Sequence, residues 1–246
     1  MNPVPGLLAA ASGTDKLSLV AIWHLATFEA KIIIVILLVF SIFAWSTMAA
    51  KALQMHRAKR LNLHFSQEFR TSPAVLDIYD RRLKVAGCPL YAVYQDGCQD
   101  IDGRLKQPVG PRKDRLSIKA VEHVKRALEG AVARESLNME SGLVILSIAV
   151  SGAPFLGLLG TVWGVMDAFG GVAVKAAAGG RADLAAMAPG VAAALITTIA
   201  GLLVAIPSMF AYNWLIHSLR VLTVELDNFA QSLASRLETE FLQDDE

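Results

Sequence analysis

Residues 142–168, GLVILSIAVSGAPFLGLLGTVWGVMDA, and residues 184–219, LAAMAPGVAAALITTIAGLLVAIPSMFAYNWLIHSL, are two long apolar stretches that contain one charged side chain, Asp167. An apolar run of about 20 residues can cross the roughly 30 Å of hydrocarbon in a bilayer as an α-helix. Both stretches reach that length, so they predict two membrane-spanning helices.

A third apolar run, IIIVILLVFSIFAWSTMAA at residues 32–50, lies between Lys31 and Lys51 and is just long enough to span. The 246-residue chain is 54% hydrophobic, more than a soluble domain of this size needs for its core. We therefore expect an all-α membrane protein with three transmembrane helices and long helical extensions beyond the membrane.

The basic residues predict the orientation of these spans. Seventeen of the 23 Lys and Arg residues fall between residues 51 and 140, and basic loops stay on the cytoplasmic side. The expected order is an outer N-terminus with an amphipathic helix (1–30), a first span (31–51), an internal helical region (52–140), a second span (141–170), an outer loop (171–184), a third span (185–219) and an internal C-terminal helix (220–246).

The two internal helices next to the spans show apolar residues every three or four positions, from residue 117 onward and again from residue 222 onward. The first is expected to run directly into the second span. Turn-forming residues at 86–89, 102–103 and 108–111 should separate shorter helical pieces. An apolar face would stay exposed on a monomer, so we expect a homo-oligomer.

Small residues and prolines indicate how the spans are built. Glycines allow helix backbones to approach closely in a membrane, and prolines bend a helix or start one. The predicted packing residues are Gly157, Gly160, Gly164 and Gly201, and the predicted bends or helix starts are Pro154, Pro189 and Pro207.

Hydroxyl groups in the apolar spans are the candidate functional groups. Thr161 lies in the second span, and Thr197 and Thr198 lie in the third. A polar side chain in hydrocarbon turns toward a helix neighbour, a backbone carbonyl or water. Thr161 and Thr198 therefore either line a pore or only bond to helix carbonyls. Thr197 points about a quarter-turn away from Thr198 and is interpreted as a packing residue.

The strings APFLGLLGTVWGVMDAF at 153–169 and APGVAAALITTIAGLLVAIPSMFAYN at 188–213 resemble the TolQ, ExbB and MotA family of ion-driven motor subunits, and TolQ most. The resemblance covers the three-span plan and nearly the whole second half of the chain. It implies a pentamer around a pore that holds the single helices of ExbD- or TolR-like partners, each with an essential aspartate. Matched by motif, the threonines of the proton pathway are Thr161 and Thr198.

The same resemblance implies a subunit of the bacterial inner membrane that converts the proton-motive force into work on the envelope, through either TolQ-like constriction or ExbB-like energised import. One position departs from the family pattern, since APG-x-A-E-A-L usually carries glutamate where this chain has Ala193. A carboxylate inside a membrane is costly and is used sparingly. We hypothesise that Thr161, Thr198 and the partner's aspartate suffice for conduction.

Three alternatives are weighed against this function. A sodium-driven motor would need ligands that the partner would have to complete. A homo-oligomeric scaffold would use the threonines and glycines for packing alone. An intramembrane serine protease is disfavoured, because Ser151 lacks the usual nucleophile setting.

The remaining polar residues suggest no further chemistry. Asp167 is a candidate for the pore mouth or the outer surface, and Glu140 is a candidate for a vestibule or a helix-start charge. The five histidines and two cysteines show no metal-binding spacing. We expect no cofactor, no metal, no nucleic acid partner and no enzymatic activity.

Overall fold

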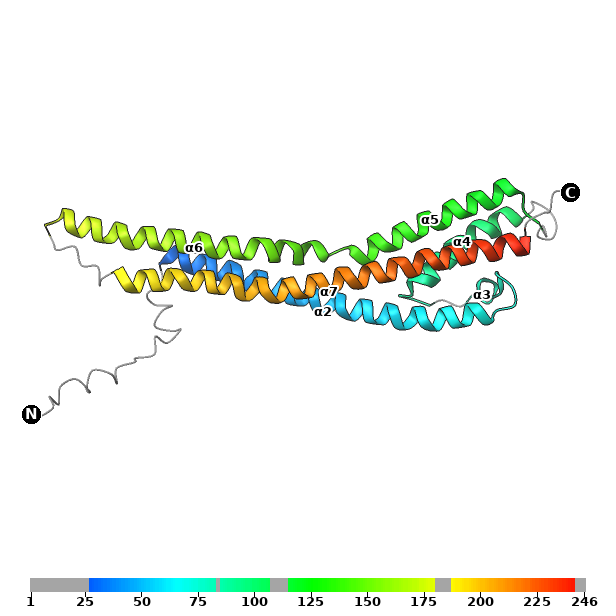
Figure 1. Cartoon of the computed structure of the whole chain (residues 1–246), viewed down its shortest axis with the longest axis horizontal. Helices are drawn as coiled ribbons and strands as arrows, with labels where there is room; N and C mark the ends of the chain where they lie inside the picture. The colour runs from blue at the N-terminus through cyan, green and yellow to red at the C-terminus, as the bar shows by residue number, and fades with distance from the viewer. Residues whose placement is uncertain (1–26, 83–84, 107–114, 180–186, 242–246) are drawn as a thin grey trace, which may run out of the picture. The chain divides into compact units, whose positions relative to one another are not determined.

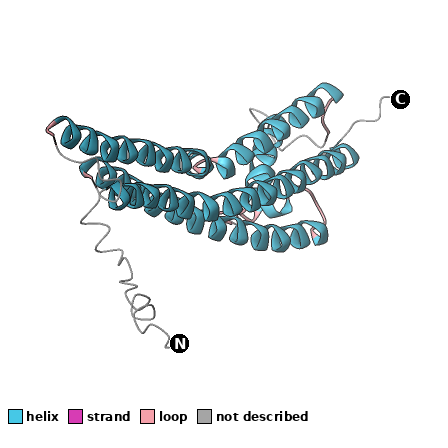
Figure 2. Ribbon diagram, turned by 60° about the vertical axis from the view of Figure 1, so that its left-hand side comes forward, coloured by secondary structure: helices cyan, strands magenta, loops and turns pink. Residues whose placement is uncertain are grey.

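The computed structural model describes residues 27–82, 85–106, 115–179 and 187–241, and in these residues it contains helices and no β-strand (Figures 1 and 2). In chain order the helices are α2 (Phe28–Thr71), α3 (Asp77–Asp80), α4 (Pro89–Leu105), α5 (Ile118–Glu140), α6 (Leu143–Ala177) and α7 (Ala188–Phe241). Helices α2, α6 and α7 are long and apolar enough to cross a membrane. The predicted all-α membrane fold with three spans is confirmed.

The chain forms two compact units. The first, here called the membrane unit, comprises the described residues of Met1–Ser46 and Ile145–Phe210. The second comprises the described residues of Thr47–Val144 and Ala211–Glu246, and it is here called the extramembrane unit because most of it lies outside the predicted spans. The N-terminal amphipathic helix predicted within residues 1–30 and the turn predicted at 108–111 lie almost entirely outside the described residues.

The membrane unit has a small core. Ile33 and Leu37 of α2 pack with Ala153 of α6 and with Val204 and Ala205 of α7. Most of its other large apolar side chains are exposed, including Phe155, Val162, Leu203 and Phe210. Leaving such side chains in water would cost about 1.5–3 kcal/mol each. This surface is therefore suited to lipid or to other subunits.

The extramembrane unit has a conventional core. Five aromatic rings from α2, α4 and α7 lie in mutual contact, with neighbouring centroids 5.1–6.4 Å apart; they belong to Phe65, Phe69, Tyr91, Tyr94 and Phe229. Most members of the apolar rows predicted from the helical spacing are buried on α5 and α7, whereas Ile118, the first residue of α5, is exposed. Their buried members include Val121, Val124, Leu128, Val132, Leu222, Leu226, Leu233 and Leu237.

Arg236 of α7 joins the end of α2 to this core. Its guanidinium group donates hydrogen bonds to the carbonyl oxygens of Phe69, at 2.8 Å, and of Ser72, at 2.9 Å. It also lies over the Phe69 ring, 4.7 Å from the centroid. The last carbonyl groups of a helix have no partner within that helix, so Arg236 acts as a side-chain cap for α2.

The break between α5 and α6 contradicts the predicted continuous helix. Helix α5 ends at Glu140, Ser141 leaves the helical conformation with ψ near 135°, and α6 starts at Leu143. Gly142 has a φ of +84°, which glycine adopts more readily than other residues. Glu140 is therefore the last residue of α5, and its interpretation as a helix-start charge of the second span is wrong.

The turn predictions have mixed outcomes. The turn at 86–89 is confirmed, because Gly87 has a φ of +82° and Pro89 is the first residue of α4. The turn at 102–103 is wrong, because both residues lie in the last turn of α4. There Asp102 forms an ion pair with Lys106, one helical turn away. Helix α6 also continues to Ala177, into the segment predicted as an outer loop.

Replacing Arg236 by lysine is expected to lower the stability of the chain by roughly 1–3 kcal/mol, because a lysine ammonium cannot bond both carbonyls and stack on the ring as the guanidinium does. Thermal unfolding in detergent, followed by circular dichroism, measures the change. Arg126→Lys on the exposed face of α5 is the matched control, with an expected effect within about 0.5 kcal/mol. Equal melting temperatures for the two variants would contradict the capping role.

Both cysteines are expected to be unreactive in the folded chain. Cys88 and Cys98 are free and buried, and burial raises the pKa of both thiols, that of Cys98 to about 12. A rise of that size reduces the reactive thiolate of Cys98 by about a thousandfold near neutral pH. A thiol-specific reagent should label two thiols per unfolded chain and almost none per folded chain, and the Cys98→Ser variant should label once when unfolded. Fast labelling of the folded protein would show that this core opens.

Candidate functional site

Helices α6 and α7 meet through glycine. A Cβ atom added at Gly157 would lie 2.8 Å from the carbonyl oxygen of Thr197 and 2.9 Å from the Cα atom of Thr198. A Cβ atom at Gly160 would lie 2.5 Å from Oγ1 of Thr197. Real Cβ atoms essentially never come this close to other atoms, so only glycine allows this approach.

The other two predicted packing glycines lie at the same contact between α6 and α7. A Cβ atom at Gly164 would lie 2.7 Å from Cβ of Ala194, and one at Gly201 would lie 2.5 Å from the carbonyl oxygen of Ala153. Of the predicted prolines, Pro154 and Pro207 lie inside α6 and α7, and Pro189 is the second residue of α7. Pro189 thus occupies the first turn, where a missing N–H costs no helical hydrogen bond.

The close approach brings Thr161 and Thr198 into contact. Their hydroxyl oxygens are 2.5 Å apart, and either hydroxyl can be the donor. Each hydroxyl also lies within hydrogen-bond distance of the Gly157 carbonyl oxygen, at 3.0 Å for Thr161 and 3.2 Å for Thr198. Both side chains are half-buried. The pair therefore bonds to a helix carbonyl and also keeps part of its surface open.

Thr197 completes a cluster of three hydroxyl groups around one carbonyl. Its side chain is fully buried, and its hydroxyl can donate to the carbonyl oxygens of Gly157, at 3.0 Å, and of Ala194, at 2.6 Å. The interpretation of Thr197 as a packing residue agrees with this burial. Its bond across to α6 was not predicted, because the sequence does not show which carbonyl lies opposite.

The acidic residues singled out from the sequence do not join this cluster. Asp167 is exposed on α6, six residues beyond Thr161, or about 9 Å along the helix axis. Glu140 is exposed at the end of α5. Ala193, at the position where the family pattern has glutamate, is buried against Ala30 of α2. In the described parts of α6 and α7 that surround the threonines, no ionisable side chain approaches the hydroxyl groups.

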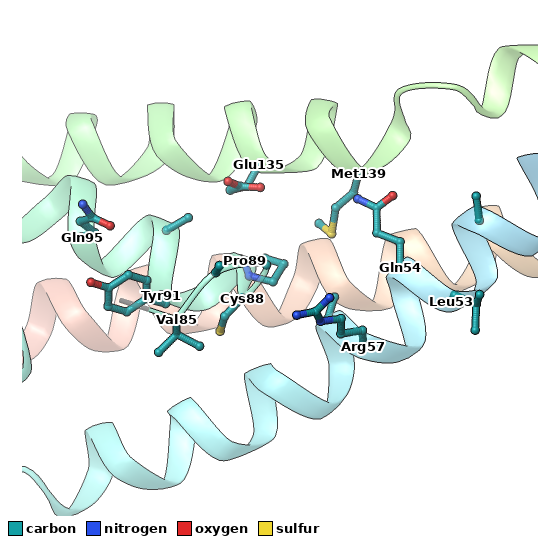
Figure 3. A pocket seen from close by; sticks show the side chains of 15 residues that line it. Leu53, Gln54, Arg57, Val85, Cys88, Pro89, Tyr91, Gln95, Glu135 and Met139 are labelled. Carbon is teal, nitrogen blue, oxygen red and sulfur yellow. The ribbon is translucent and has the colours of Figure 1, made fainter. Parts of the chain in front are cut away.

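The extramembrane unit contains a separate cavity of about 690 Å³ between α2, α4 and α5 (Figure 3). Arg57 of α2 and Glu135 of α5 are its charged lining residues, and burial raises the pKa of Glu135. The remaining lining side chains are mainly apolar. Across the described residues, no group of three His, Cys, Asp or Glu side chains could hold a metal ion. The cavity presents no recognisable catalytic arrangement.

Comparison with known proteins identifies the family. The chain is 34% identical over 218 residues to the Tol-Pal system protein TolQ of Haemophilus influenzae, covering 87% of this chain and 90% of the relative. It is 31% identical over 199 residues to TolQ of Pseudomonas aeruginosa, covering 78% and 82% of the two chains. It is 27% identical over 205 residues to the biopolymer transport protein ExbB of Neisseria meningitidis serogroup A, covering 83% and 90%.

The match to a protein family extends across the break between α5 and α6 and through most of the threonine-bearing helices. Residues 105–228 match the MotA/TolQ/ExbB proton channel family. This range contains Thr161, Thr197 and Thr198 together with the glycines that bring them into contact. The chain belongs to the MotA/TolQ/ExbB proton channel family.

Proposed function

We propose that this chain is an inner-membrane subunit of a proton-driven motor, which acts with a single-span ExbD- or TolR-like partner to convert the proton-motive force into work on the cell envelope. The observation that carries the proposal is the contact between the hydroxyl groups of Thr161 and Thr198, 2.5 Å apart within two apolar helices. The proposal extends a family membership that the sequence comparisons support.

The chemistry of the pair fits an uncharged part of a proton path. A hydroxyl group donates one hydrogen bond and accepts others without changing its own charge. Ionisable groups in hydrocarbon are costly and face a hydrated path where they occur. Helix α7 contains no Asp, Glu, Lys or Arg from Ala188 to Leu219. The group that gains and loses the proton is therefore assigned to the partner's aspartate.

The exposed surface of the membrane unit supports an oligomer around that partner. Large apolar side chains cover α2, α6 and α7 outside the small core. We propose a pentamer with α6 and α7 facing the pore, an N-terminus in the periplasm and a C-terminus in the cytoplasm. The excess of Lys and Arg between residues 51 and 140 favours this orientation.

The relatives include both TolQ and ExbB proteins. The proposal therefore concerns the step that both would share, in which proton flow through a hydroxyl-lined contact drives movement of the partner. A homo-oligomeric scaffold without conduction is the alternative, and it predicts normal assembly without proton flow.

Removing either hydroxyl of the pair is expected to reduce proton flow at least about tenfold, because a hydrogen bond to a charged group contributes roughly 1.5–3 kcal/mol. Thr161→Val and Thr198→Val keep the side-chain volume and remove the hydroxyl, whereas Thr161→Ser and Thr198→Ser keep the hydroxyl and should retain most of the flow. The assay measures proton uptake into vesicles that contain the complex with its ExbD- or TolR-like partner, under an imposed potassium diffusion potential.

Ser208→Ala is the matched control for these variants. Ser208 is buried in α7, and its hydroxyl donates to the Val204 carbonyl oxygen of its own helix at 2.7 Å. Its loss should leave proton uptake unchanged. Wild-type uptake in both valine variants would refute the proposed function, and a wild-type complex that assembles without any uptake would favour the scaffold.

Native mass spectrometry of the purified complex is expected to show five copies of this chain with partner subunits bound. The number five is what the family resemblance implies, and the large apolar surface left open on one membrane unit favours association of several copies. A stable dimer that binds no partner would contradict the proposed architecture.

A further inference from the structure

The hydroxyl of Thr197 lies between two acceptors and can serve only one of them fully at a time. Its oxygen is 2.6 Å from the Ala194 carbonyl oxygen of its own helix and 3.0 Å from the Gly157 carbonyl oxygen of α6. A hydroxyl group carries a single proton. The side chain is fully buried, so solvent offers no third partner. Rotation about the C–O bond thus moves the hydrogen bond from one helix to the other.

The Gly157 carbonyl is also an acceptor for the Thr161–Thr198 pair. One proton of the pair forms the bond between the two hydroxyl groups, and the other points to Gly157 from Thr161 or from Thr198. In either arrangement both protons are used inside the cluster. The pair then presents only oxygen lone pairs to its surroundings, so it can accept from a protonated carboxyl group but cannot donate to a carboxylate.

We propose that Thr197 is a positioning residue that takes over the Gly157 carbonyl when the Thr161–Thr198 pair turns a proton outward. This inference rests on the proposed function, because the outward partner is the aspartate of the single-span subunit. With that acid protonated, the pair donates to Gly157 and Thr197 donates to Ala194. With the acid ionised, one hydroxyl of the pair donates to the carboxylate and Thr197 donates to Gly157.

The rearrangement conserves every proton of the cluster. Each of the three hydroxyl groups keeps its own proton and changes only the acceptor, so the partner's acid alone titrates. The titratable side chains on the described helices of the membrane unit are Glu29 and Lys31 on α2 and Asp167 and Lys175 on α6, while α7 has none between residues 188 and 210. None of these four side chains forms a hydrogen bond with the threonine cluster. The pH dependence of proton flow should therefore follow the partner's acid.

The variants Thr197→Val and Thr197→Ser separate this role from packing. Valine keeps the side-chain volume but lacks the hydroxyl group. The Thr161–Thr198 pair therefore continues to donate to the Gly157 carbonyl oxygen, and the partner's carboxylate loses a hydrogen-bond donor. The midpoint of proton uptake against pH should then rise by roughly one pH unit, and uptake at neutral pH should fall by about tenfold. Serine keeps the hydroxyl and should stay within about twofold of wild type. A packing role predicts the opposite order, because serine leaves a methyl-sized gap and valine does not.

The experiment compares pH profiles of proton uptake in vesicles that contain the full-length chain in complex with its ExbD- or TolR-like partner. A raised midpoint in Thr197→Val together with a normal profile in Thr197→Ser supports the proposal. A normal profile in Thr197→Val, or equal impairment in both variants, overturns it. If the valine variant fails to assemble, Thr197→Ala replaces it, since alanine removes the hydroxyl without added bulk, and the same raised midpoint is required.

The outcomes also distinguish this proposal from the function on which it rests. Loss of uptake in Thr161→Val with a normal profile in Thr197→Val would reject the role of Thr197 and retain the proton path. Normal uptake in all of these valine variants would reject both.

Discussion

The contact between the backbones of α6 and α7 is the constraint on which the rest of the membrane unit depends. At Gly157 even one additional carbon atom would overlap the main chain of α7. Lipid tails are as apolar as leucine, so apolar side chains provide little drive for helices to associate within a bilayer, and close packing with hydrogen bonds matters more. Glycine supplies both here, because it shortens the distance between the helices and exposes a carbonyl group to hydroxyl groups from the other helix.

The two units bury different shares of their apolar side chains, because their surroundings differ. The extramembrane unit encloses a cluster of aromatic rings and closes the end of α2 with Arg236. The membrane unit buries few large side chains and leaves many exposed. In water that pattern would be unstable, whereas in hydrocarbon, or against a second subunit, the same side chains lose nothing by facing outward.

Much of this arrangement could be predicted from the sequence. The length of the apolar runs predicts the three spans, and the spacing of Val121, Val124 and Leu128 predicts the buried face of α5. The missing information concerns register between helices. The position of Thr197 along α7 indicates its direction relative to Thr198, but only the alignment of α6 against α7 shows that the Gly157 carbonyl lies opposite. The competition between turn and helix was equally hard to judge at Asp102–Gly103. These residue types favour a turn, but both residues lie in α4, where Asp102 forms an ion pair with Lys106.

The break between α5 and α6 at Gly142 limits how twist can pass along the chain. Helix α2 has no internal proline, so its main-chain hydrogen bonds can run without a gap from one unit into the other, whereas α7 loses one such bond at Pro207. Between α5 and α6 the ladder of main-chain hydrogen bonds is interrupted at a residue with a left-handed backbone conformation. Twist applied to α6 can therefore be absorbed at the interruption before it reaches α5, whereas α2 offers no such interruption along its length.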